Sequence, residues 1–342
     1  LDVNLIILKK TIYWNALVIK ASLIQQQVRC LKDLPKDHFI FSQLKKEIRT
    51  HSMLSQCKSS ISLLVRNGAD TFYLIKWGAW ALVALYLSIV SGIIVGLQYD
   101  YSTPYYSSSS LDILIPYGYY FRSLHFYTSQ FFFFFTCFHF VAVYQSTDKY
   151  KQVEWFKLVS TIPVIILLLF TGYILRGDST GASAGMIAES IVHTIPILGG
   201  VFDSILLSLD NSGLRKVYIQ HVAGLDVVLF LLLWTHLRIY RINITNYLPI
   251  CGAMLLFSVA IYAPMDPEKL GTTYIAGPWF FLGLQELLRY LAPFIAGVVV
   301  PLCFVGLLYS IQPCHVNHMS YVRILIFSLM IYAGLSMVAY LR

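Results

Sequence analysis

The stretches HFYTSQFFFFFTCFH (residues 125–139) and HVAGLDVVLFLLLWTH (residues 221–236) each begin and end with a histidine inside a mostly apolar run. The second stretch is longer than the first by a single residue. In an α-helix, both separations amount to about four turns, which return the side chain to roughly the same face after a rise of about 21–22 Å. Each stretch therefore predicts a helix with one histidine near each side of a membrane's hydrocarbon core.

The composition of the whole chain agrees with a membrane protein. Of its 342 residues, 57% are hydrophobic and only 12% are charged, whereas soluble domains are about 45–50% apolar and about 25% charged. A soluble domain, a disordered chain and a nucleic-acid-binding domain are therefore excluded, although the net charge is +8. The six cysteines show no CxxC pattern and no paired spacing, so we expect neither a disulfide framework nor a zinc site.

Seven apolar segments follow residue 70, and most of them are long enough to cross a membrane. We expect spans at about 73–97, 117–144, 156–175, 218–240, 248–263, 292–311 and 321–340. The segment at 248–263 is the shortest of the seven and the least certain span. The predicted fold is an all-α membrane protein of about seven transmembrane helices.

The distribution of basic residues predicts how the chain lies in the membrane. Residues 1–70 hold 11 of the 25 Lys and Arg residues against five acidic residues, which predicts a basic segment at the membrane surface. The turns at 149–157 and 238–241 are also basic, whereas 98–121 contains no Lys or Arg. By the positive-inside rule, we expect the N-terminus in the cytoplasm. The connections expected on the outer side are 98–121, 176–217 and 264–291.

The four histidines of the opening stretches form two pairs at matched depths. Because one span separates the two helices, both run from outside to inside, with His125 and His221 at the outer level and His139 and His236 at the inner level. A single histidine inside a membrane is more often a hydrogen-bonded packing residue. Two pairs about 20 Å apart in a low-dielectric bundle are what two bis-imidazole haems require. We therefore expect two non-covalent haem b groups.

Three further residues fit the same geometry. Gly78 and Gly92 are separated by the same interval as His125 and His139, so a small residue recurs at each haem level, where a porphyrin edge could approach the backbone. Ordinary helix packing explains two such glycines equally well. Arg122 lies one turn before His125 and could pair with a haem propionate at the outer surface, or simply anchor the helix among lipid headgroups.

Five segments together resemble the cytochrome b subunit of the bc1 and b6f quinol–cytochrome c oxidoreductases. They are PYGYYFRSLHFYTSQFFFFFTCFHF (116–140), FTGYIL (170–175), IPILGG (195–200), LRKVYIQHVAGLDVVLFLLLWTHLRIYR (214–241) and GPWFFLGLQELLRYLAP (277–293). The resemblance covers about residues 70–340. The count of seven spans and the longer histidine separation in the second stretch are more similar to the b6 type joined with its separate subunit in one chain.

The resemblance implies three parts of the chain. After the basic surface segment 1–70, residues 71–245 would form a four-helix di-haem b core, and residues 246–342 a three-helix part similar to subunit IV. It also implies a lower-potential haem at the outer level and a higher-potential haem at the inner level. The position of the cysteine that attaches an extra covalent haem in b6-like proteins falls near Lys76, so we expect no such haem.

The resemblance further implies a reaction and partners. An outer site would oxidise quinol, pass one electron to a Rieske-type iron–sulfur protein and a c-type cytochrome, and send the other through the haems to an inner quinone-reduction site. The expected complex is a homodimer that contacts lipids and quinones and binds no nucleic acid. We expect it in a bacterial cytoplasmic membrane, with an organelle inner membrane as second choice. The quinone type is left open.

The chain departs from the family at the outer site. Where the family has Pro-Glu-Trp-Tyr, this chain has GPWF at 277–280, so the proton-accepting carboxylate is missing. Where the family has Pro-Trp after the motif GYxL, this chain has RG at 176–177. Glu286, Glu189 and His193 are the candidate replacements for the carboxylate, and each could equally be a solvated or hydrogen-bonded loop residue.

Other departures and candidates concern the remaining contacts. Gly172 has no partner glycine at the separation that joins Gly78 and Gly92, because Leu158 stands at that position. This absence weakens the case for haem packing on the helix of Gly172. Tyr173 and Trp279 lie in the matching motifs as candidate cofactor or quinone contacts, and Arg241 could hold a propionate or a quinone at the inner side.

Two other functions fit the same sequence. One is a haem-b subunit that does not bifurcate electrons and links the quinone pool to a periplasmic multihaem cytochrome or a dehydrogenase. The other is a haem-free transporter or scaffold, in which intramembrane histidines relay protons. An absorption spectrum separates the haem-free function from the others, and copurification of a Rieske-type protein separates the first two.

Overall fold

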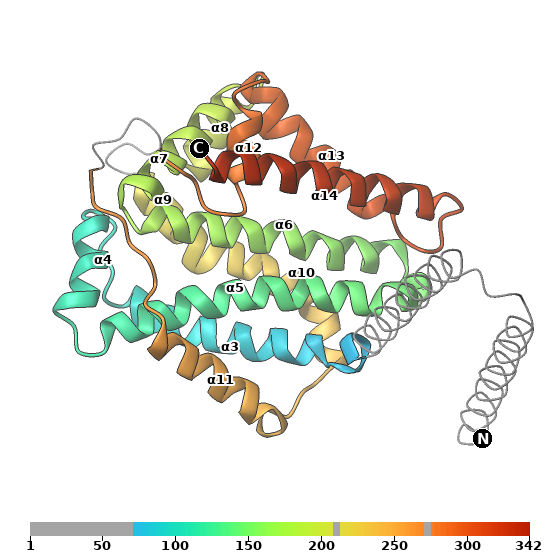
Figure 1. Ribbon diagram of the computed structural model, residues 1–342, viewed down its shortest axis with the longest axis horizontal. Coiled ribbons are helices and arrows are strands. Elements are labelled where there is room, and N and C mark those ends of the chain that lie inside the picture. The colour runs from blue at the N-terminus through green and yellow to red at the C-terminus, as the bar shows by residue number, and fades with distance from the viewer. Residues whose placement is uncertain (1–70, 208–212, 270–274) are drawn as a thin grey trace, which may run out of the picture. The chain divides into compact units, whose positions relative to one another are not determined.

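Four long helical stretches lie side by side in the computed structural model, which describes residues 71–207, 213–269 and 275–342 (Figure 1). They are α3 (Trp77–Gly96), α5 (Gly118–Val143), α6 (Gln152–Leu175) and the stretch made of α9 (Gly213–Ile219), η3 (Gln220–Gly224) and α10 (Leu225–Ile239). No β-strand occurs in the described residues. The predicted surface segment 1–70 lies outside them.

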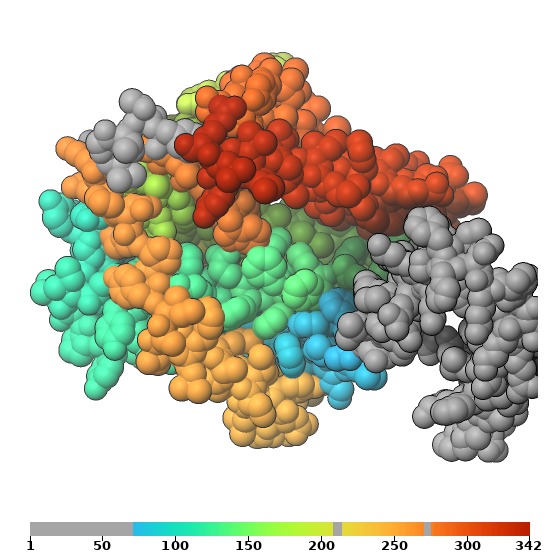
Figure 2. All heavy atoms as spheres, in the orientation of Figure 1, coloured from blue at the N-terminus to red at the C-terminus, as the bar shows by residue number. Residues whose placement is uncertain are grey.

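The other helices cover the ends of this four-helix core and lie along more than one of its sides (Figure 1). They are α4 (Pro104–Ile113), η2 (Tyr144–Lys149), α7 (Ser179–His193), α8 (Gly199–Leu206), η4 (Ile244–Tyr247), α11 (Leu248–Ala260), α12 (Leu282–Leu287), η5 (Ile295–Val299), α13 (Val300–Ser310) and α14 (His318–Tyr340). In the space-filling view, α14 and the orange connection after α11 lie on the visible face (Figure 2). Residues Tyr73–Arg342 form one compact unit.

Helix length and composition support the predicted membrane fold. Five stretches in the described residues are long and apolar enough to cross a membrane: Trp77–Gly96, Gly118–Lys149, Gln152–Leu175, Leu214–Ile239 and His318–Tyr340. The predicted spans at 248–263 and 292–311 correspond to the shorter apolar helices Ile244–Ala260 and Ile295–Ser310. The all-α fold with apolar spans is therefore confirmed, and the segment expected to be shortest is one of the two short ones.

Hydrogen bonds at one end of the bundle, here called the α7 end, join connections that are far apart in sequence. The Arg122 guanidinium donates to the carbonyl of Ala263 at 2.8 Å, which brings the start of α5 to the segment after α11. The amide of Ser179, at the start of α7, donates to the carbonyl of Pro267 at 3.1 Å. The connections after α3, α6 and α11 therefore meet at this end.

The opposite end, here called the η2 end, is joined in the same way. The Trp155 indole donates to the carbonyl of Tyr309 at 2.9 Å, and the Gln312 amide donates to the carbonyl of Tyr150 at 2.9 Å. Tyr144 also donates its hydroxyl to the carbonyl of Ile311. The turn after α5 and the turn after α13 thus lie together at this end. Consecutive apolar helices therefore run in alternating directions between the two ends.

A buried polar network shapes the corner between α6 and α7. Asp178 caps α7 by accepting from the amide of Gly181 at 2.9 Å, and the same carboxylate pairs with Arg176 at 2.7 Å. It also accepts from the amide of Asp266 at 3.0 Å, which ties the corner to the segment after α11. Gly177 turns the chain with φ of +70°, and a Cβ there would lie 2.5 Å from the amide nitrogen of Tyr105.

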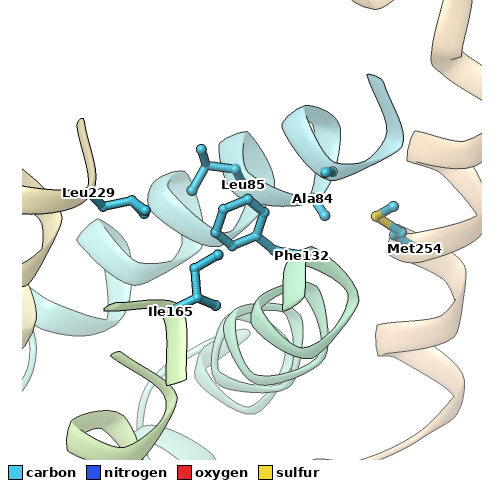
Figure 3. Packing of buried hydrophobic residues seen from close by; sticks show 7 residues of the cluster. Ala84, Leu85, Phe132, Ile165, Leu229 and Met254 are labelled. Atoms are coloured by element: carbon cyan, nitrogen blue, oxygen red, sulfur yellow. The ribbon is translucent and has the colours of Figure 1, made fainter. Parts of the chain in front are cut away.

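An apolar cluster occupies the middle of the bundle (Figure 3). Phe132 of α5 stands midway along the chain between the two histidines of its helix, and it packs with Leu85 of α3 and Leu229 of α10. Ala84 and Ile165 complete the contact between neighbouring helices, and Met254 adds α11. The cluster therefore fills the level midway between the two histidine levels with apolar side chains.

This cluster predicts a difference between two leucines of α10. Leu229 is 1% exposed and Leu231 is 65% exposed. Leu229→Ala should lower the free energy of unfolding by about 2–5 kcal/mol, because it leaves a cavity among packed side chains. Leu231→Ala should change it by less than about 1 kcal/mol. Thermal unfolding of the purified proteins measures both, and equal destabilisation would contradict the assigned core.

Candidate functional site

The two histidines nearest the α7 end face each other across the bundle. His125 of α5 and His221 of η3 have ring centroids 6.1 Å apart. With a metal–nitrogen bond of about 2 Å on each side, two imidazoles that share one metal ion have centroids on the order of 6 Å apart. The spacing of this pair therefore suits ligation of a single iron.

The second pair, nearer the η2 end, repeats this arrangement. His139 of α5 and His236 of α10 also have ring centroids 6.1 Å apart. Both pairs thus join the same two helical stretches, with the apolar cluster around Phe132 between them. The structure brings together the four histidines in the two pairs that their spacing predicts.

A π-turn explains why one helical stretch needs one more residue between its histidines than the other. In a straight α-helix, the longer separation carries a side chain about 60° past its starting direction. The η3 turn, Gln220–Gly224, contains His221 and is a π-helix, in which one extra residue is accommodated within a turn. The extra residue is absorbed there, so both pairs close at the same spacing.

Three glycines leave bare backbone against the histidine rings. A Cβ at Gly78 would lie 2.9 Å from Cε1 of His139, and a Cβ at Gly92 would lie 2.8 Å from Cε1 of His125. These are the two glycines that the sequence suggested. A Cβ at Gly172 of α6 would lie 2.9 Å from Cε1 of His221. Small residues at these positions therefore let the rings, and a planar group held by them, approach the helix backbone.

Gly172 was not predicted as a site residue, because Leu158 stands where its partner glycine was expected. Its contact with His221 shows that α6 approaches the ring at the α7 end even without that second glycine. A signal existed in the sequence, since Gly172 lies within the motif FTGYIL. This signal was overlooked because two glycines were expected on the same helix.

Hydrogen bonds at Nδ1 fix the two rings nearest the α7 end. Nδ1 of His125 lies 2.8 Å from the carbonyl oxygen of Ser88, and Nδ1 of His221 lies 2.9 Å from the hydroxyl of Thr171. A bond at Nδ1 orients the ring and leaves Nε2 as the metal-binding nitrogen. Sequence reasoning missed Ser88 and Thr171, whose only signal was their polarity within apolar helices. The donor set, the spacing and the glycine contacts together fit a bis-imidazole haem.

Arg122 is engaged within the protein. Its guanidinium makes two contacts of 2.7 Å with the carboxylate of Asp112 on α4, in addition to the bond to Ala263. Tyr262 also donates its hydroxyl to Asp112. The pKa of Tyr262 is raised mainly by burial and to a smaller extent by this hydrogen bond. Arg122 thus holds α4 and the segment after α11 against α5, and its predicted role toward a propionate stays a prediction.

The other predicted contact residues lie at separate places. Tyr173 lies under the guanidinium of Arg176, 4.3 Å from ring centroid to Cζ. Trp279 donates from its indole to Gln130 at 2.9 Å and stacks on Phe134 of α5, with centroids 5.1 Å apart. Arg241 is exposed just beyond α10. Their roles toward haem or quinone stay predictions.

A cavity of about 440 Å³, largely open to its surroundings, lies between α7 and the segment that contains α12. Its lining consists of Ser183, Met186, Ile187, Ser190 and Ile191 on α7, with Gln285, Leu288, Arg289 and Pro293 opposite. Most of these side chains are apolar, and a few polar groups stand among them, as in small-molecule sites generally.

The three predicted proton acceptors do not line this cavity. Glu286 of α12 is 1% exposed, accepts from the hydroxyl of Tyr290 at 2.9 Å, and pairs with Arg342 at 3.1 Å. Glu189 and His193 lie one turn apart on α7 beside Asp203 of α8. The structure therefore brings Glu189 and His193 together and places Glu286 in a different cluster.

The Glu189–His193–Asp203 cluster is the one group in the described residues whose ligand atoms could converge on a metal ion. These atoms lie within 4.8 Å of one another, and Nε2 of His193 is 3.5 Å from the Asp203 carboxylate. Ligand atoms around one tetrahedral ion lie closer together, at about 3.3 Å, when each bond is about 2 Å. The cluster as it stands is a polar contact between α7 and α8.

Comparison with known proteins gives a consistent family. Residues 61–244, more than half of the chain, match the family "Cytochrome b/b6/petB". Cytochrome b of Acanthamoeba castellanii is 25% identical over 268 residues, which cover 66% of this chain and 69% of that protein. Cytochrome b6 of Heliomicrobium gestii is 21% identical over 174 residues, covering 48% of this chain and 81% of that protein.

The fold agrees with the same family. A chain of a solved structure described as "Hyperthermophilic respiratory Complex III" superposes with a TM-score of 0.58 at 21% identity, covering 77% of this chain and 83% of the other. The low identity makes this a likeness of fold alone. Together with the family match, it leads to one conclusion: the chain belongs to the cytochrome b/b6 family, whose members are haem-b proteins of membrane electron transport.

Proposed function

We propose that the chain is the cytochrome b subunit of a quinol:cytochrome c oxidoreductase, with His125 and His221 holding one haem b and His139 and His236 holding a second. The observation that carries this proposal is the repeated centroid spacing of 6.1 Å in two pairs from the same two helical stretches. Bound haem would supply one-electron chemistry at its iron.

The chain's own residues would orient and separate the two sites. Ser88 and Thr171 bind Nδ1 of the two outer rings. The neighbouring backbone carries no side chain at three positions, Gly78, Gly92 and Gly172. The apolar cluster around Phe132 excludes water between the two levels. The haem-free transporter or scaffold is set aside, because the chain belongs to a haem-b family.

The cavity between α7 and the α12 segment is the proposed site of quinol oxidation. Its walls are mostly apolar, as an isoprenoid quinone requires. Gln285 in the wall accepts from the amide of Gly277, which begins the GPWF segment that resembles the family's outer-site motif. We place this site on the outer face of the membrane and a quinone-reduction site near Arg241 on the inner face. Glu189 and His193 lie outside the wall of the cavity and remain candidates to receive protons that water carries from it.

The proposed partners follow from this function. A Rieske-type iron–sulfur protein and a c-type cytochrome would accept electrons at the outer face of a homodimeric complex. We propose a bacterial cytoplasmic membrane as the location, before an organelle inner membrane. Isolation of the complex under mild detergent, with identification of the attached subunits and a redox-titrated haem spectrum, tests all of these assignments together.

A second function stays open on one observation. None of the side chains that line the cavity in the described residues is a carboxylate. A subunit that passes both electrons along one route, to a periplasmic multihaem cytochrome or from a dehydrogenase, needs no bifurcating site. A copurifying multihaem cytochrome without an iron–sulfur protein would establish this second function instead.

The histidine pairs predict which haem each substitution removes. His125→Ala and His221→Ala should each reduce the haem b content to about half and remove the same component of the redox titration, because each iron needs both rings. His139→Ala and His236→Ala should remove the other component. His315→Ala, in the turn before α14, serves as control and should keep both. Loss of both haems in His125→Ala alone would contradict independent pairs.

The glycine contacts predict a steric effect at one site. Gly92→Val should remove the component assigned to His125 and His221, since even a Cβ would lie 2.8 Å from the His125 ring. Gly252→Val on α11 is the matched control, because a Cβ there meets nothing within 4 Å. Haem content and redox titration measure both variants. An unchanged titration in Gly92→Val would show that the close approach has no role at this site.

A further inference from the structure

Most polar groups in the cavity wall have already used their hydrogen-bond donors. Ser183 donates its hydroxyl to the carbonyl of Ser179 at 2.7 Å, and Ser190 donates to the carbonyl of Met186 at 2.8 Å, both within α7. A serine that donates to its own helix can still accept from a ligand, but it has no second proton to give. The two serines therefore offer acceptors only.

Gln285 is committed in the same way. Its side-chain amide donates to the carbonyl of Ile275 at 2.7 Å, while its oxygen accepts from the amide of Gly277 at 2.7 Å. Both ends of the side chain thus hold the segment that precedes α12. The residue shapes the wall, and its main hydrogen bonds point to this segment.

Arg289 is the charged side chain of the wall, and its donors are the least committed. Its ion-pair contact within the described residues runs from Nε to Glu286 at 4.0 Å, beyond hydrogen-bond distance. The side chain is 46% exposed, so its end can turn toward the cavity. A guanidinium offers five N–H donors in a planar fork.

The charges of the cluster formed by Arg289, Glu286 and Arg342 do not cancel. Glu286 is buried and takes its close ion pair from Arg342 at 3.1 Å, with the hydroxyl of Tyr290 at 2.9 Å. Two guanidinium groups therefore share one carboxylate. The cluster keeps an excess positive charge, and Arg289 carries it on the side of the cavity.

We propose that Arg289 binds the head-group oxygen of the quinol and that the cavity selects a head group in its anionic form. This inference rests on the proposed function, which makes the cavity a quinol site. It also accounts for the absence of a carboxylate from the GPWF segment. When the hydroxyl O–H bond of the quinol breaks, the electron pair stays on the oxygen facing Arg289 and the proton passes to water. No carboxylate in the wall is then needed.

The test uses the full haem-loaded complex and two probes that differ in charge. One is a 2-hydroxy-3-alkyl-1,4-naphthoquinone, ionised at neutral pH, and the other is its uncharged 2-methoxy analogue. Arg289→Gln should weaken binding of the ionised probe about tenfold or more, as expected when a charge-assisted hydrogen bond is lost. It should change binding of the methoxy probe by less than about threefold, and Arg289→Lys should recover most of the loss. Calorimetry measures all of these constants.

Two further variants sharpen the result. Arg323→Gln, in the first turns of α14 at the η2 end, removes one arginine far along the helix from Arg342 and should leave both constants unchanged. Glu286→Gln adds to the excess positive charge and should keep or tighten binding of the ionised probe. Weaker binding of that probe in Glu286→Gln would contradict the charge argument.

Each remaining outcome is decisive. Equal weakening of both probes in Arg289→Gln would show that the residue only shapes the wall, and unchanged binding would show that it does not face the ligand. Either result overturns the inference while the cavity remains a quinone site. If the unsubstituted complex binds neither probe and quinol reduces none of its haem, the proposed function of the cavity is wrong instead.

Discussion

The close approach of imidazole rings to bare helix backbone is the constraint on which this bundle depends. A polar ring within apolar helices needs a partner for each nitrogen, and it needs space that ordinary side chains would fill. Gly92 and Gly172 supply that space for His125 and His221, and Ser88 and Thr171 supply partners. The positions of α3 and α6 relative to α5 and η3 follow from these contacts. The apolar cluster around Phe132 then fills what remains.

The connections at the α7 end stabilise this arrangement by different chemistry. Arg176 and Gly177 follow α6, and the next residue is a buried aspartate, Asp178, that pairs with Arg176, caps α7 and binds the segment after α11. A buried ion pair stabilises a fold only when its other hydrogen bonds are also made. Here Asp178 accepts from two backbone amides, so a polar network holds the corner that carries the cavity wall.

Much of this architecture could be predicted from sequence, because it follows from periodicity. The spans follow from apolar length, and the facing histidines follow from their separations along two helices. The π-turn at His221 could not be predicted, since nothing in the residue types of QHVAG marks it. Nor could the partner of Arg122, because Asp112 lies on a separate helix whose placement depends on the tertiary fold. The cavity was missed for the same reason: its walls come from segments that lie far apart in the sequence.

The apolar layer between the two histidine levels has an electrical consequence. An apolar medium between two sites lets much of the membrane potential fall across it. An electron that moves between levels about 20 Å apart therefore crosses much of that field, where each elementary charge gains or loses about 2.3 kcal/mol per 100 mV for the full membrane. Phe132, Ile165 and Leu229 lie in that layer. These side chains separate the two pairs of rings, so the membrane voltage would oppose or assist electron transfer between the pairs.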